Sequence, residues 1–64
     1  MKCIDIKSLK RFSGQFIGTG EHWGQLGFDD QGCFLSVGGM ILCRIKKGDL
    51  LRLGDEESIY RFTG

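Results

Sequence analysis

The chain has 64 residues, of which 41% are hydrophobic and 27% charged, and its formal net charge is +1. This length predicts one small domain over residues 1–64, and the composition excludes a disordered chain. The near-neutral charge argues against a dedicated duplex-DNA binder, which usually carries a strong basic excess.

The start of the chain carries the charged residues Lys2, Asp5 and Lys7, and no apolar segment of the kind found in signal peptides follows them. The longest apolar run, Met40 to Cys43, is far shorter than the roughly 20 residues that a membrane span needs. We therefore expect a cytoplasmic protein.

Strands are predicted along most of the chain, because short alternating segments lie between the 11 glycines. The expected strands are Lys2–Lys7, Arg11–Ile17, Trp23–Phe28, Cys33–Val37, Met40–Ile45 and Leu50–Leu53, with Ile59–Thr63 as a last strand or a frayed end. Residues 8–11 and 55–58 are each compatible with one helical turn. The pattern predicts an all-β fold, a small antiparallel barrel or curled sheet of five to six short strands, with an SH3-like or OB-like architecture.

One hairpin allows a prediction of register, because Ser36 and Arg44 mark the outer faces of its two strands. A two-residue Gly38–Gly39 loop would set the inner face of one strand against the outer face of the other. A three-residue loop that begins at Val37 avoids this conflict and is favoured. It pairs the following residues: Ser36 with Met40, Leu35 with Ile41, and Cys33 with Cys43. The two cysteines are then expected to be neighbours on a buried face.

Three cysteines and one histidine, Cys3, Cys33, Cys43 and His22, have the inventory of a zinc site but lack the short Cys-Cys spacing that such sites usually show. Structural thiols in the core are the favoured interpretation, ahead of a disulfide or a metal site. A catalytic thiolate is disfavoured further, because it needs an adjacent base in an open, electropositive site. We expect no metal, no cofactor and no catalytic residue.

The glycine-rich segment 18–24 resembles a phosphate-binding loop only superficially, because Trp23 stands where G-x-G-x-x-G requires its third glycine. A flexible loop between strands explains it. Alternation turns Trp23 outward if Leu26 and Phe28 face the core, and outward tryptophans are enriched in binding hot spots. The competing interpretation is that Trp23 covers one end of the barrel.

The sequence favours a non-enzymatic binding module that acts through protein contact, either as a homo-oligomer or as a small regulator or inhibitor of a larger protein. The expected contact residues are Trp23, Phe34, Met40 and Leu42. The competing explanation of the last three is that closure of the barrel buries both faces of their hairpin. The alternative function is single-stranded nucleic-acid binding. Its expected basic residues are Lys7, Lys10, Arg11, Arg44, Lys46 and Lys47.

Overall fold

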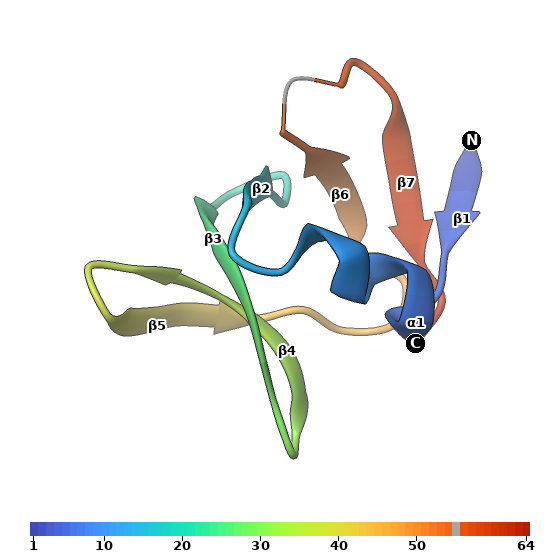
Figure 1. Ribbon diagram of the computed structural model, residues 1–64. Helices are drawn as coiled ribbons and strands as arrows, with labels where there is room; N and C mark the ends of the chain where they lie inside the picture. The colour runs from blue at the N-terminus through green and yellow to red at the C-terminus, as the bar shows by residue number, and fades with distance from the viewer. Residues whose placement is uncertain (55) are drawn as a thin grey trace.

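Seven strands form one mixed sheet in the residues that the computed structural model describes, 1–54 and 56–64. In chain order the elements are β1 (Lys2–Ile4), α1 (Ile6–Leu9), the 3-10 helix η1 (Lys10–Phe12), β2 (Phe16–Gly18), β3 (Trp23–Asp29), β4 (Gly32–Val37), β5 (Met40–Arg44), β6 (Leu50–Leu53) and β7 (Ile59–Phe62). The strand order is β1-β7-β6-β2-β3-β4-β5 (Figure 1), with β1 parallel to β7 and the other pairs antiparallel.

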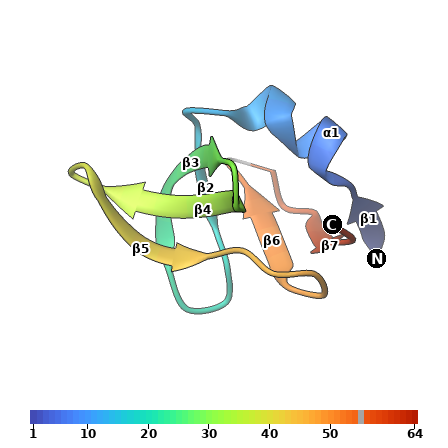
Figure 2. The same ribbon diagram turned by 90° about the horizontal axis from the view of Figure 1, so that it is seen from below.

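The prediction of a mostly-β chain is confirmed, but the sheet is not closed into a barrel. The sheet also has seven strands rather than five or six, and it is mixed rather than wholly antiparallel. The strands β1 and β5 form its two edges, so the predicted closure that would bury both faces of the β4–β5 hairpin does not occur. Figure 2 shows this hairpin projecting away from α1 and from both ends of the chain.

Residues 6–12 are helical, so the predicted strands Lys2–Lys7 and Arg11–Ile17 are wrong over this segment. The Asp5 carboxylate accepts a hydrogen bond of 2.8 Å from the Ser8 amide and caps the first turn. Leu9 then lies fully buried in the core, which holds the helix against the sheet. Within this segment, a helical turn was expected only at residues 8–11. Of the second expected turn, Asp55 lies outside the described residues, and residues 56–58 are not helical.

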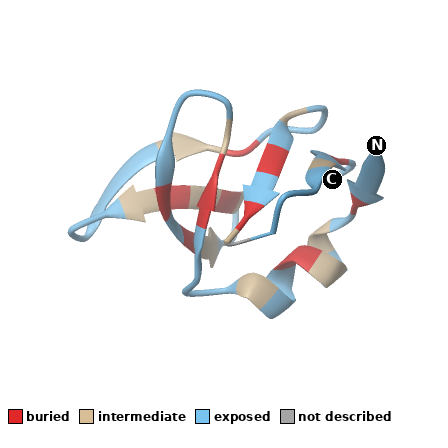
Figure 3. Cartoon of the chain, turned by 90° about the horizontal axis from the view of Figure 1, so that it is seen from above, coloured by how far each residue is buried: buried red, intermediate tan, exposed pale blue. Residues whose placement is uncertain are grey.

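The core lies on one side of the curled sheet, here called the inner face, and the opposite side is the outer face. Alternating residues of the central strands point into the core, as the buried segments in Figure 3 show. The hydrophobic strand residues that are 2% exposed or less are Ile17, Leu26, Cys33, Leu35, Leu51 and Leu53. Burial of one such leucine stabilises the fold by about 1.5–3 kcal/mol.

The β4–β5 hairpin has a different register from the predicted one. Val37 pairs with Met40 across a two-residue turn, in which Gly38 and Gly39 have φ of +58° and +83°. Positive φ at both turn positions is the geometry that favours glycine in a tight hairpin.

The conflict between faces that argued against this turn is resolved by a β-bulge. The register shifts between Leu35 and Ser36, which leaves Leu42 on β5 without a partner on β4. Cys43 consequently pairs with Leu35 and not with Cys33, so the predicted cysteine pairing is wrong. Further toward the turn, Val37 and Ile41 are exposed, although both were expected to point inward.

Candidate protein-contact surface

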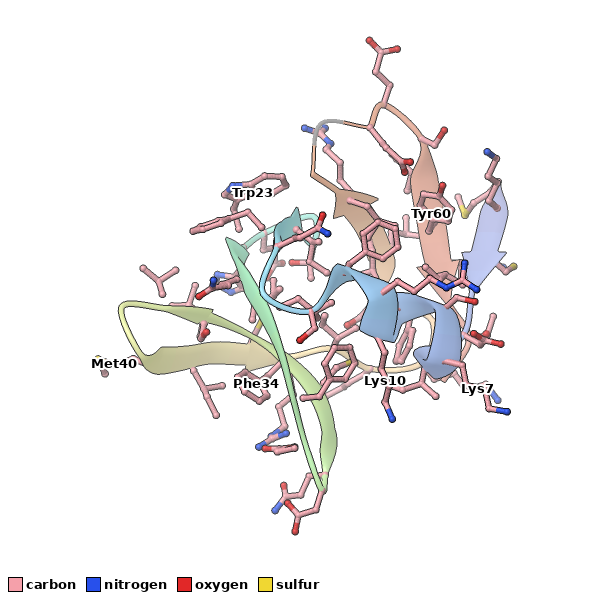
Figure 4. All side chains as sticks on the ribbon, viewed as in Figure 1. Lys7, Lys10, Trp23, Phe34, Met40 and Tyr60 are labelled. Atoms are coloured by element: carbon pink, nitrogen blue, oxygen red, sulfur yellow. The ribbon has the colours of Figure 1, made fainter. Side chains whose placement is uncertain are left out.

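The free end of the β4–β5 hairpin carries four exposed apolar residues, Val37, Met40, Ile41 and Leu42, here called the hairpin surface. The side chains of the last three residues are 74%, 50% and 45% exposed. They are exposed because this end of the hairpin extends beyond the core, with Met40 at its far end (Figure 4). Two of the predicted contact residues, Met40 and Leu42, therefore lie exposed at the same end of the hairpin.

Trp23, at the start of β3, is the third predicted contact residue and is 47% exposed. Its ring covers Gly18 of the neighbouring strand so closely that a Cβ atom at position 18 would overlap it. Gly18 and Trp23 are also direct partners in the β2–β3 register, so the ring packs across the outer face. A hollow of about 460 Å³ adjoins the ring and is lined by Trp23, Arg52, Gly54, Glu56 and Glu57.

The register also places a row of outer-face residues between β2 and the hairpin surface. Phe16 pairs with Gln25, Gln25 with Ser36, and Ser36 with Ile41, which forms one row across four strands. Phe16 and Ile41, at the two ends of this row, are about half exposed. Sequence reasoning missed both as contact residues. The expected strand Arg11–Ile17 points Phe16 the same way as Phe12, which was assigned to the core, and the favoured hairpin register points Ile41 inward.

Phe34, the fourth predicted contact residue, is half-buried and belongs to a structural cluster. Its ring lies over Gly27, where a Cβ atom would come within 2.6 Å of two ring carbons. The Arg44 guanidinium carbon lies 5.7 Å from the centre of the same ring. Figure 4 shows Phe34 well separated from Trp23. The structure therefore does not bring Phe34 together with Trp23.

Arg44 also forms an ion pair with Asp29 of β3. Its Nη1 and Nη2 donate hydrogen bonds of 3.0 Å and 2.7 Å to the two carboxylate oxygens. This pairing lowers the pKa of the Asp29 carboxyl and raises the pKa of Arg44. The positive charge of Arg44 is thus already paired within the chain.

The other residues of the predicted nucleic-acid site are exposed but come from two segments. Lys7, Lys10 and Arg11 lie on α1 and η1, whereas Lys46 and Lys47 lie in the connection between β5 and β6. The Lys46 amide donates a 2.9 Å hydrogen bond to the Asp49 carboxylate, which places an acidic group beside this second segment.

A hollow of about 540 Å³ lies between the β2–β3 loop and the β5–β6 connection, and its lining includes Glu21, His22, Cys43 and Asp49. Burial raises the pKa of the Cys43 thiol, and the charges of Asp49 and Glu21 raise it further. The thiol is therefore protonated at neutral pH and is a poor nucleophile. Among residues 1–54 and 56–64, no three His, Cys, Asp or Glu side chains are grouped so that they could hold a metal ion.

Comparisons with known proteins give no match that would help to interpret this surface. No protein-family model matches the chain, and no curated protein or solved structure matches it either. In the part of the chain that the structure describes, no helix has the length and apolar character needed to cross a membrane.

Proposed function

We propose that the chain is a non-enzymatic binding module that acts by protein contact through the hairpin surface and Trp23. The observation that carries this proposal is the exposure of three successive apolar residues, Met40, Ile41 and Leu42, on the edge strand β5. Apolar side chains gathered at one end of a hairpin favour a contact site, because leaving them in water is unfavourable. Trp23 adds the type of side chain that most often dominates binding energy.

Catalysis in the hollow beside Cys43 is a weaker candidate function than protein contact through the apolar surface. A protonated thiol lacks nucleophilic character, and a general base for it would have to come from His22 or a carboxylate. The two carboxylates, Asp49 and Glu21, act on Cys43 only by raising its pKa further. We therefore propose a role in binding and not in chemistry.

Single-stranded nucleic-acid binding is the second candidate, and the exposed Lys7, Lys10 and Arg11 on one helical segment favour it. Two features weaken it: the charge of Arg44 is paired with Asp29, and the Phe34 ring is covered by Arg44. An OB-like or SH3-like relationship, which would suit this role, stays a prediction for the open sheet. This function predicts binding that weakens steeply as salt is added.

Site-specific photo-cross-linking distinguishes these functions. A benzoylphenylalanine placed at Met40 is expected to capture a discrete protein adduct in cells of the source organism, either a second copy of the chain or another protein. The matched control places the same group at Ile59, an exposed apolar residue of β7 outside the hairpin surface. A result with no protein adduct at Met40, or with equal adducts at both positions, would overturn the proposal.

A further inference from the structure

The free edge of β5 is the part of the hairpin surface that is best suited to pairing. β4 is the only hydrogen-bonded neighbour of β5 among the described residues, so one row of its backbone N–H and C=O groups has no strand partner. Edge strands are commonly protected from pairing by charged side chains or proline. Met40, Ile41 and Leu42 provide neither, and the charge of Arg44 is held by Asp29. The bulge at Leu42 is a further protective device, and it leaves only a short segment of β5 free to pair.

The other edge of the sheet differs from β5 in this respect. β1 has only three residues, and it begins with Lys2, whose ammonium group lies 5.9 Å from the centre of the Tyr60 ring. A short strand that carries a lysine is protected in the usual way. The contrast makes β5 the edge that is open to a further strand.

We propose that β5 pairs antiparallel with β5 of a second copy of this chain, so that two sheets join edge to edge about a twofold axis. The proposal rests on the function proposed above and identifies its partner. In a register centred on Ile41, each Ile41 faces its own mate, and Met40 faces Leu42. Arg44 then faces Gly38, so no like charges are opposed.

The charge of the whole chain does not oppose a second copy as the partner. The formal net charge is +1, so two copies repel each other only weakly. The bulge at Leu42 limits the length of regular pairing, because it breaks the spacing of the ladder there. We therefore expect a short paired segment and a reversible dimer.

The size of the interface sets the expected affinity. A standard interface buries about 800 Å² on each partner. That is nearly a fifth of the 4394 Å² surface of this chain. Three residues of one strand supply less area than this. We expect a dimer with a dissociation constant in the micromolar range. Light scattering and sedimentation equilibrium would detect such a dimer at chain concentrations between about 10 µM and about 1 mM.

The decisive comparison uses two matched variants, Ile41→Lys and Ile59→Lys. Both replace a strand isoleucine of similar exposure, 50% and 45%, with the same charged residue, but only Ile41 lies on β5. The wild type and Ile59→Lys should approach twice the monomer mass with rising concentration, and Ile41→Lys should stay monomeric. Circular dichroism of both variants should match the wild-type spectrum, which checks that they are folded.

A monomeric wild type at every concentration would overturn the dimer. Equal dimerisation of the two variants would overturn the assignment to β5. These failures are distinct from a failure of the proposed function, because cross-linking at Met40 still reports a foreign protein partner when the chain is monomeric.

Disulfide trapping tests the proposed register directly. On a Cys3→Ser background, Ile41→Cys places two thiols opposite each other, at about the Cα separation of 4.4–6.8 Å that a disulfide requires. Oxidation by diamide, which accepts two electrons and two protons, should then yield a covalent dimer of Ile41→Cys but not of Ile59→Cys. Covalent dimers in equal amounts from both variants would contradict the register.

Discussion

The close approach of β3 and β4 at Gly24 leads to a quantitative prediction about stability. A Cβ atom at Gly24 would lie 2.8 Å from the Ser36 carbonyl oxygen and 3.3 Å from the Ser36 carbonyl carbon and amide nitrogen. These are backbone atoms of the paired strand, so the strands themselves must separate to accept a methyl group. We predict that Gly24→Ala destabilises the fold.

The expected loss follows from two opposing contributions. Overpacking costs about 1–3 kcal/mol, whereas the lower entropy of the unfolded alanine chain returns about 0.4–1 kcal/mol. The net loss is about 1–2 kcal/mol, out of a total of about 3–10 kcal/mol for a chain of this length. With an m-value near 1 kcal/mol per molar urea, the unfolding midpoint should fall by about 1–2 M.

Gly18→Ala is the control, because the nearest atoms there belong to the Trp23 ring, which can rotate away. It should change the tryptophan fluorescence spectrum but lower the urea midpoint less than Gly24→Ala does. Urea unfolding followed by far-ultraviolet circular dichroism measures both midpoints independently of the tryptophan. A wild-type midpoint for Gly24→Ala would refute the inferred close approach.

Two further predictions concern titrating groups. Alkylation by iodoacetamide should be fastest at the exposed Cys3, slower at Cys43 and slowest at Cys33, because burial raises the pKa of the last two thiols. Mass spectrometry of timed samples gives the order of reaction, and equal rates at the three thiols would contradict this prediction. The Asp29–Arg44 pair lowers the pKa of Asp29 from its ordinary 3.8, so its stabilisation is complete above that value and is lost as pH falls through the lowered one. Between pH 5 and pH 2, roughly the range over which such carboxylates titrate, the melting temperature of Asp29→Asn should therefore fall less than that of the wild type. An equal fall in melting temperature for the two proteins would argue against a stabilising pair.

Much of the central sheet follows from local sequence pattern. Leu26, Cys33 and Leu35 were expected to point inward, and they are buried because alternation along β3 and β4 is regular there. The helical segment was harder to predict, since it holds only one α-turn and one 3-10 turn. Its stability comes from the Asp5 cap and from packing of Leu9, and the second of these depends on the tertiary fold.

The candidate surface was predicted only in part, because the exposed face of a strand depends on its register. Met40 and Leu42 were identified, whereas Ile41 between them was assigned to the core. Phe16 was missed because its strand begins later than expected, with the turn and helix before it reversing the assumed alternation. The sequence alone did not indicate that Phe34 packs over Gly27, a contact between residues of adjacent strands.

The bulge explains both the error in register and the apolar edge. Because Leu42 has no partner on β4, Cys43 and Ile45 return to the inner face while Met40 and Ile41 pair tightly with the residues before the turn. Residues 40–42 are not among the residues that form the core or pack against it, and polar side chains there would be better solvated. Folding stability does not account for three apolar residues on an open edge, and this supports the proposal that a contact buries them.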